Sequence, residues 1–425
     1  MKKFIQAMKE AKDNDLIKLP LDLALGTCAN CNNCAEQCSV YQATREEAYL
    51  PALRSDLLRR VYKKHFTLAG KLFGKLVGAE DLDEDRLNLM AESFYRCTMC
   101  RRCALECPLG IDNMLITRTA RTLLTRAGIT PKILDESVDA QLKTGNVSKI
   151  PPLAFIDMVE FLEGEMKEAT GREIHFPRDR CSPEILLIPP VVDFIMNAET
   201  MMGIAETLYA AGADWTLSTA LIDSANFGVF FDDDSLVKIA QLFVEEAKKL
   251  KPKKVVIGEC GHAYKAANKF YDLLSGPFPF QIQSVLELTA SYLQQGKIKV
   301  NPEANRDPVT LHDPCNVARM GGIVEEPRSI LQAVCKDFRE MNPHGVENYC
   351  CGGGGSLVLI EELHDFRMEV SGKKKVEQIR ATGARVVAAP CANCKKQLAE
   401  LVEYYKLDVK VVGVHDLVGR ALVWE

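Results

Sequence analysis

The spacing of the cysteines constrains this sequence more than any other feature. The chain has sixteen cysteines, and twelve of them fall into four short groups. A disulfide framework would scatter its cysteines, and a chain of 425 residues can bury a sufficient core without crosslinks. The grouped spacing therefore indicates metal ligation in a reducing compartment.

Two of the groups share the Cys-x2-Cys-x2-Cys-x3-Cys spacing of two-cluster bacterial ferredoxins. They are Cys28, Cys31, Cys34 and Cys38, and Cys97, Cys100, Cys103 and Cys107. In such runs three cysteines bind one [4Fe-4S] cubane and the fourth crosses to the other cluster. The spacing predicts two cubane clusters, one held by Cys28, Cys31, Cys34 and Cys107, the other by Cys97, Cys100, Cys103 and Cys38. Structural zinc is the alternative, but zinc sites normally show paired spacing.

Five further cysteines form a differently built site in the C-terminal half. They follow the pattern Cys315-x34-Cys350-Cys351-Gly-x38-Cys391-x2-Cys394. Adjacent cysteines point in different directions, so both can serve one cluster only if it is larger or more open than a single cube edge. The glycine run 352–355 offers backbone without side chains, which would permit close approach and N–H donation to cluster sulfides.

The C-terminal half contains two diverged copies of one unit. Short apolar runs alternate there with longer helical ones, which is typical of an α/β fold. The segment 309–315 lies 124 positions after 185–191, and 386–391 lies 131 positions after 255–260. This alignment places Val191, Asn226 and Phe227 at the ligand positions of the first copy, where only Cys260 remains.

These patterns predict an α plus α/β protein. We expect an α-helical ferredoxin domain over 1–125, a connector over 126–180, a degenerate CCG repeat over 181–300 and a cluster-binding CCG repeat over 301–425.

Charge and hydropathy patterning narrow the possible locations and partners. The charged N-terminal stretch does not fit a secretory signal, and no run of about 18 apolar residues occurs that could span a bilayer. A net charge of −5 does not indicate a nucleic-acid-binding protein, which would normally be basic. We expect a cytoplasmic protein, peripheral to the membrane through partner subunits.

On its cysteines, the chain resembles the CCG-domain family. That family includes catalytic subunits of heterodisulfide reductase, iron-sulfur subunits of glycolate and lactate oxidases, and subunits of membrane redox complexes. The resemblance implies that Cys315, Cys350, Cys351, Cys391 and Cys394 hold one noncubane [4Fe-4S] cluster that splits a disulfide. Because the first copy has lost its ligands, the chain is most similar to single-site relatives, the cytoplasmic subunits of Dsr-, Tmc- and Hmc-type complexes.

Two functions remain open at this point. In the first, a membrane cytochrome or quinone-interacting subunit feeds electrons through the cubanes to the third cluster, which reduces or forms a disulfide or trisulfide. A small sulfur-carrier protein is a possible substrate. In the second, the chain is a non-catalytic relay subunit of a flavin dehydrogenase or benzoyl-CoA reductase-type complex.

A few residues outside the ligand sets carry separate expectations. Cys260 with His262 would be a catalytic pair, because a neighbouring imidazolium lowers a thiol pKa and can protonate a leaving thiolate. The alternative is a residual buried cysteine beside a helix-capping histidine. His312 is expected to orient the loop before Cys315. The basic amphipathic stretch 54–75 would either dock a membrane subunit or pack within its own domain.

Overall fold

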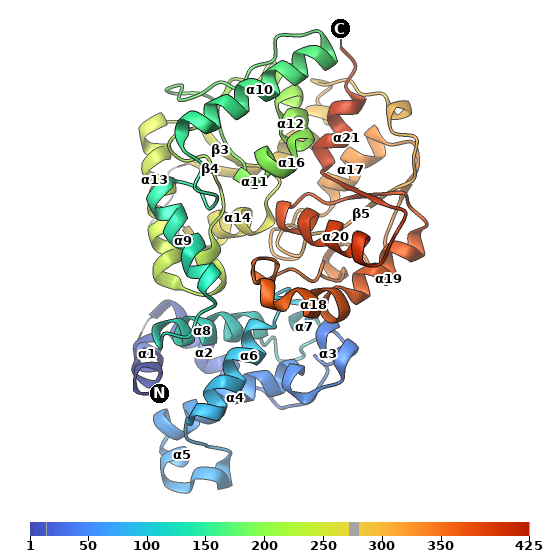
Figure 1. The fold of residues 1–425 in the computed structure, drawn as a ribbon. Coiled ribbons are helices and arrows are strands. Elements are labelled where there is room, and N and C mark those ends of the chain that lie inside the picture. The colour runs from blue at the N-terminus through green and yellow to red at the C-terminus, as the bar shows by residue number, and fades with distance from the viewer. Residues whose placement is uncertain (14, 272–279, 425) are drawn as a thin grey trace. The chain divides into compact units, whose positions relative to one another are not determined.

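The computed structural model describes residues 1–13, 15–271 and 280–424, and the chain forms two compact units (Figure 1). The first unit comprises Met1–Asp135, Val229–Asp233 and Gly352–Lys374. The second comprises Glu136–Gly228, Asp234–Cys351 and Lys375–Glu425.

The first unit is helical. Its helices are α1 (Lys2–Asp13), α2 (Asp15–Gly26), α3 (Ser39–Thr44), α4 (Pro51–Phe66), α5 (Leu68–Phe73), α6 (Glu84–Tyr95), α7 (Arg102–Leu105), α8 (Asn113–Arg126) and α18 (His364–Phe366). Helix α8 begins where the Asp112 side chain accepts hydrogen bonds from the Met114 and Leu115 N–H groups. It contacts α1, α2, α4 and α6, and therefore forms the centre of this unit.

The second unit contains two sheets, each of four parallel strands. The first sheet has the order β2-β1-β3-β4 and the second the order β6-β5-β7-β8. The strands are β1 (Ile185–Ile188), β2 (Trp215–Thr216), β3 (Lys254–Ile257), β4 (Gln281–Ser284), β5 (Val309–Leu311), β6 (Phe338–Arg339), β7 (Val386–Ala388) and β8 (Lys410–Val412). The identical order supports the duplication, and the predicted α plus α/β class is confirmed.

Helices lie between consecutive parallel strands, as parallel pairing requires, and further helices precede the first strand or follow the last. They are α9 (Lys132–Thr144), α10 (Pro152–Thr170), α11 (Val191–Met196), α12 (Ala198–Ala210), α13 (Asp233–Leu250), α14 (Gly261–Ala266), α16 (Val285–Gln294), α17 (Glu325–Val334), α19 (Lys373–Thr382), α20 (Ala392–Tyr404) and α21 (Val414–Ala421). Helix α12 of the first repeat packs on α21 of the second, and α17 packs reciprocally on α16. Since α12 and α17 occupy equivalent places, as do α16 and α21, the repeats meet as a pseudo-twofold pair.

Strand pairing corrects the alignment of the repeats by one residue. Ile188 pairs with Ile257 in the first sheet, as Leu311 pairs with Ala388 in the second. The sequence alignment makes Ile257 of β3 equivalent to Ala388 of β7. The strands paired with them then make Ile188 equivalent to Leu311, so the offset between β1 and β5 is one residue smaller than the 124 positions expected. The equivalence of Cys260 and Cys391 remains, since each N–H donates to the carbonyl two residues earlier, at 2.6 and 2.7 Å.

The segment expected to be a connector contributes to an α/β core. Helix α10 buries Phe155, Val159 and Met166 in the same apolar cluster as Ile185 and Leu187 of β1. The predicted helical run in this segment is present, and it covers the first sheet rather than linking two bodies.

The basic stretch 54–75 divides into two parts with different surroundings. Helix α4 buries Arg54, Leu58, Arg59 and Val61 within the first unit, so it packs as an internal helix. Beyond it, α5 and the turn η2 (Gly74–Val77) expose Leu68, Leu72, Phe73 and Leu76. We call this segment, 68–77, the apolar tip. Over the residues that the structure describes, no helix has both the length and the apolar character to cross a membrane.

Candidate iron-sulfur sites

The two ferredoxin-type loops adopt the same backbone conformation. In the first loop Asn30 and Asn32 have φ values of 51° and 63°, and in the second Met99 and Arg101 have values of 49° and 64°. These are the second and fourth positions after the first cysteine in each loop. Left-handed residues are uncommon outside glycine and asparagine, so Met99 and Arg101 are held there by their loop. Such turns aim successive N–H groups into one concavity, which suits an anionic cluster.

The fourth cysteine of each loop lies among the sulfurs of the other. Cys34 interacts electrostatically with Cys28 and with Cys107, whereas burial raises the pKa of Cys38 to about 11, with Cys97 and Cys100 among its charged neighbours. A cavity in this unit is lined by Cys38, Cys97, Cys100 and Cys103. The donor set and its grouping fit the crossed ligation that the spacing predicts. Cys31 is exposed at the surface.

Buried arginines stand beside the second set of sulfurs. Burial alone would lower the pKa of Arg54, but the charges of Cys97, Cys38 and Cys103 raise it. Arg121 is fully buried and donates to the carbonyl oxygens of Phe94, Cys97 and Gly355. Neither arginine belongs to the cysteine motifs, and the sequence offered no signal for either.

Two glycines of the run 352–355 lie against neighbouring backbone. A Cβ on Gly352 would lie 2.6 Å from the Cα of Gly372, and one on Gly355 would lie 2.7 Å from the Cys97 carbonyl oxygen. Both glycines have positive φ, at 102° and 63°. Within the first unit, they let this segment pack against neighbouring backbone, including the second ferredoxin loop.

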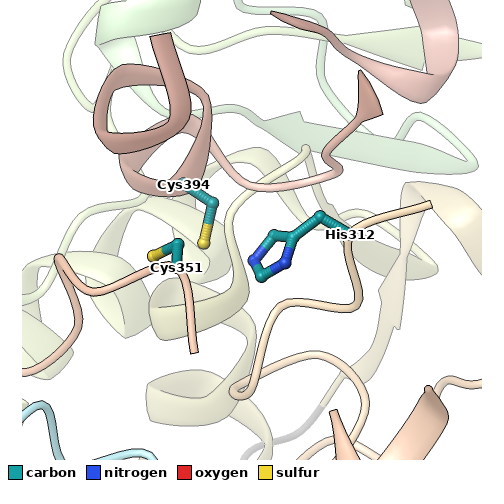
Figure 2. Close-up of side chains that lie close together, drawn as sticks. All are labelled: His312, Cys351 and Cys394. Atoms are coloured by element: carbon teal, nitrogen blue, oxygen red, sulfur yellow. The ribbon is translucent and has the colours of Figure 1, made fainter. Parts of the chain in front are cut away.

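The third site lies at the carboxyl ends of β5 and β7, in the second unit. His312 directly follows β5, Cys391 is the N-cap of α20, and Cys394 lies in the first turn of that helix. A ring nitrogen of His312 and the Sγ atoms of Cys351 and Cys394 all lie within 4.8 Å of one another, and all three residues are buried (Figure 2). Parallel strands bring the residues that follow them to one edge, which explains why distant sequence positions meet here.

Cys391 receives hydrogen bonds from two helix N-termini. The Cys394 side chain and the N–H groups of Gly261, Asn393 and Cys394 together hold the pKa of Cys391 below its ordinary value. Gly261 begins α14 of the first repeat, whereas Asn393 and Cys394 lie in α20 of the second. Cys391 therefore loses its proton more readily than an ordinary cysteine, which suits the ligation of iron.

Buried charges surround the remaining cysteines. The Arg328 guanidinium donates to both carboxylate oxygens of Asp313 at 2.9 and 2.8 Å, and the Gly345 N–H donates to Asp313 at 2.7 Å. These bonds fix the loop that leads to Cys315. Lys375 is fully buried, and its pKa is lowered to about 8 by burial despite the nearby Cys351, Cys350 and Cys394. Its charge would offset part of the negative charge of clustered thiolates.

Cys260 and His262 lie beside Cys391, but they are packed rather than open. The Asn226 N–H donates to Nε2 of His262 at 3.3 Å, and Nδ1 lies 3.3 Å from Cys260 Sγ. Burial lowers the pKa of His262 to about 3 and raises that of Cys260 well above its usual range. His262 is therefore a neutral imidazole whose Nδ1–H faces the Cys260 sulfur, and the expected imidazolium is corrected.

Side chains of the first repeat pack closely around His262. The Phe227 ring stacks on His262 with centroids 4.9 Å apart, and the Tyr271 hydroxyl lies 3.3 Å from Asn226 Nδ2. Among the described residues, aromatic rings therefore pack against Cys260 and His262, which are both buried.

A buried ion-pair network joins the two repeats behind Cys394. Lys395 Nζ lies 2.9 Å from Asp193 and 3.5 Å from Glu259, and it donates to Thr200 Oγ1 at 2.9 Å. His415 Nδ1 lies 2.7 Å from the other Glu259 oxygen. Lysine and histidine come from the second repeat and the acids from the first, so the network fixes α20 against its partner repeat.

Two family models match the parts of the chain that contain these cysteines. A family model described as a 4Fe-4S dicluster domain matches residues 24–111, and one described as a cysteine-rich domain, CCG, matches residues 309–399.

Full-length relatives match as well. The chain is 31% identical, over 99% of its length and 83% of the relative's, to the Hdr-like menaquinol oxidoreductase iron-sulfur subunit 2 of Archaeoglobus fulgidus. It is 30% identical, over 99% and 82%, to the corresponding iron-sulfur subunit of Archaeoglobus profundus. It is 26% identical, over 94% of both chains, to one subunit of the dihydromethanophenazine:CoB–CoM heterodisulfide reductase of Methanosarcina mazei. The chain therefore belongs to the CCG-domain family of heterodisulfide reductase-like iron-sulfur oxidoreductase subunits.

Proposed function

We propose that this chain passes electrons through two cubane clusters to a third, noncubane cluster at which a disulfide or trisulfide is reduced. The observation that supports this most is the buried gathering of Cys351, Cys394 and His312, beside Cys391, whose pKa is lowered by hydrogen bonds from two helix N-termini. When bound, the clusters would supply electrons singly. Cleaving one S–S bond consumes two electrons and two protons and releases two thiols.

The residues around this site would each have a defined task. Cys315, Cys350, Cys351, Cys391 and Cys394 would hold the third cluster. Lys375 would offset the charge of the thiolates, and Asp313 with Arg328 would fix the loop of Cys315. Cys260 lies near Cys391, but it is not one of the five cysteines that we assign as ligands.

A single substitution at Cys260 tests the catalytic proposal. If the Cys260 thiol exchanges with a substrate sulfur, Cys260→Ser should lower disulfide turnover at least tenfold, a change of about 1.4 kcal/mol or more in barrier. Transfer of single electrons to a soluble acceptor should be unchanged, and all three cluster EPR signals should persist. The measurement compares both activities in the same anaerobic preparation.

The outcomes separate three possibilities. Unchanged disulfide turnover in Cys260→Ser would remove the thiol from the mechanism, and loss of the third cluster signal would make Cys260 a ligand. A wild-type protein that transfers single electrons but reduces neither disulfides nor trisulfides would be a relay subunit. Cys335→Ser is the matched control, since Cys335 is also buried but is the C-cap of α17 and belongs to none of the cysteine motifs.

The electron donor that we propose is a membrane cytochrome or quinone-interacting subunit, which would hold the chain peripheral to the membrane. Two relatives are named as menaquinol oxidoreductase subunits, and menaquinol is dissolved in the membrane. The apolar tip gives such a subunit a surface to bind, since Leu72 is 75% and Leu76 is 90% exposed and Lys71 stands between apolar neighbours. Exposed apolar patches of this kind mark interaction sites.

We expect the double variant Leu72→Glu/Leu76→Glu to release most of the chain from its membrane subunit. Two charges would enter an apolar contact, whereas the folded chain would lose nothing because both side chains are exposed. Leu153→Glu is the control, since Leu153 is 77% exposed in the second unit. Sedimentation with native membranes measures the effect. Wild-type binding to protein-free anionic vesicles would assign the tip to lipid instead, and equal sedimentation of all variants would exclude it from docking.

A further inference from the structure

His312 is a buried histidine whose polar atoms have no protein partner. It is fully buried, and neither ring nitrogen has a hydrogen-bond partner in the part of the chain that the structure describes. A buried polar group without a hydrogen-bond partner is costly, so native proteins rarely leave one unsatisfied without a bound group nearby. A bound group other than a protein side chain would satisfy the imidazole nitrogens.

Orientation of the loop does not account for this histidine. That task falls to the next residue, Asp313, through Arg328 and the Gly345 N–H. The backbone of His312 is also fixed independently of its ring, since its N–H donates to the Ala388 carbonyl at 2.8 Å. The role expected from the sequence is thus filled by other groups, and the ring faces the site.

The ring stands where it can share a metal with two thiolates. A ring nitrogen of His312 and the sulfurs of Cys351 and Cys394 all lie within 4.8 Å of one another (Figure 2). Iron accepts imidazole and thiolate ligands together, and histidine in place of cysteine raises the reduction potential of an iron-sulfur centre. Three donors of these types around one point form a ligand set.

We propose that His312 ligates iron in the third cluster, its nitrogen binding the same iron as the sulfurs of Cys351 and Cys394. The neutral ligand adds a sixth protein donor to the five cysteines. It also keeps that iron less negatively charged than a further thiolate would. This inference rests on the third cluster of the proposed function, but it does not depend on which substrate is reduced.

Pulsed EPR on the anaerobically prepared full chain tests the ligand directly. We expect the third cluster to show a strongly coupled nitrogen whose coupling changes when the protein is labelled with ¹⁵N-histidine. The coupling should vanish in His312→Ala and persist in His262→Ala, the control at another buried histidine of this region. The labelled wild-type measurement needs no variant, so a folding defect in His312→Ala does not affect it.

A second measurement uses the conservative exchange of ligands. His312→Cys should retain the cluster and lower its midpoint potential, because an anionic thiolate favours the oxidised state. A third-cluster signal without strongly coupled histidine nitrogen, or an unchanged potential in His312→Cys, would overturn the ligand assignment while leaving the proposed function intact. Absence of any third-cluster signal, with both cubanes filled, would overturn both.

Discussion

We expect replacement of Cys351 by alanine to lower the iron content of the anaerobically prepared protein from about twelve atoms per chain to about eight. The Cys351 sulfur stands beside the ligand atoms of Cys394 and His312, and the Cys394 and Cys351 thiols are hydrogen-bonded in the structure. Removing it would take one ligand from the third cluster. The eight ferredoxin-type cysteines lie in the other unit and would keep their clusters.

Iron analysis combined with EPR at graded potentials measures this effect. Cys335→Ala is the control, because it also removes a buried thiol but leaves the ligand set complete. It should retain about twelve irons. A wild-type content near eight with both cubanes filled would contradict the third cluster, and a Cys351→Ala content near twelve would contradict the role of Cys351.

The local features of the ferredoxin loops could be predicted because their determinants are local. A cluster imposes its spacing on cysteines that follow one another within about ten residues, and the same spacing produced the same left-handed positions in both loops. The alternation of strands and helices was equally accessible, since it depends on local hydrophobic periodicity. Registers depend on pairing, and there the alignment of the first strands was wrong by one residue.

The fate of the glycine run could not be predicted, because its partners are remote in the chain. The segment Gly352–Lys374 packs into the helical unit, where Arg121 donates to both the Cys97 and Gly355 carbonyls. Arg121 and Gly355 are separated by 234 positions, and neither carries a motif for the contact. The close packing of Gly352 and Gly355 against backbone depends on these remote contacts, and no local pattern in the sequence indicates it.

At the third site, the sequence supplied the cysteines but not their neighbours. His312 could have been recognised, because it follows β5 at the sheet edge where Cys391 follows β7. No sequence pattern indicated Lys375. Its burial near Cys350, Cys351 and Cys394 depends on where the chain places the start of α19. The ion-pair network of Lys395 was likewise invisible, since it needs both repeats to be placed.

The ion-pair network of Lys395 gives the second large expected effect, on the stability of the folded chain. We expect Lys395→Met to destabilise the protein by about 3 to 5 kcal/mol, because Asp193 and Glu259 would remain buried without their cation. Lys395 is only 3% exposed, so water cannot replace its ammonium group. In thermal unfolding of the iron-loaded chain, this corresponds to a decrease in Tm of about 10 °C. Lys396→Met should change stability by less than about 0.5 kcal/mol, since the neighbouring Lys396 is partly exposed.

A double variant shows whether charge or packing causes the loss. If uncompensated carboxylates are responsible, Asp193→Asn added to Lys395→Met should recover part of the lost Tm, because one of the two buried charges is removed. Asn197 already donates to Asp193 at 2.8 Å, and an amide oxygen can accept this bond. A double variant no more stable than Lys395→Met would assign the effect to lost packing at the start of α20. Since Cys394 precedes Lys395 in that helix, the third-cluster EPR signal of both variants then reports whether the ion pairs hold the ligand in place or only hold the repeats together.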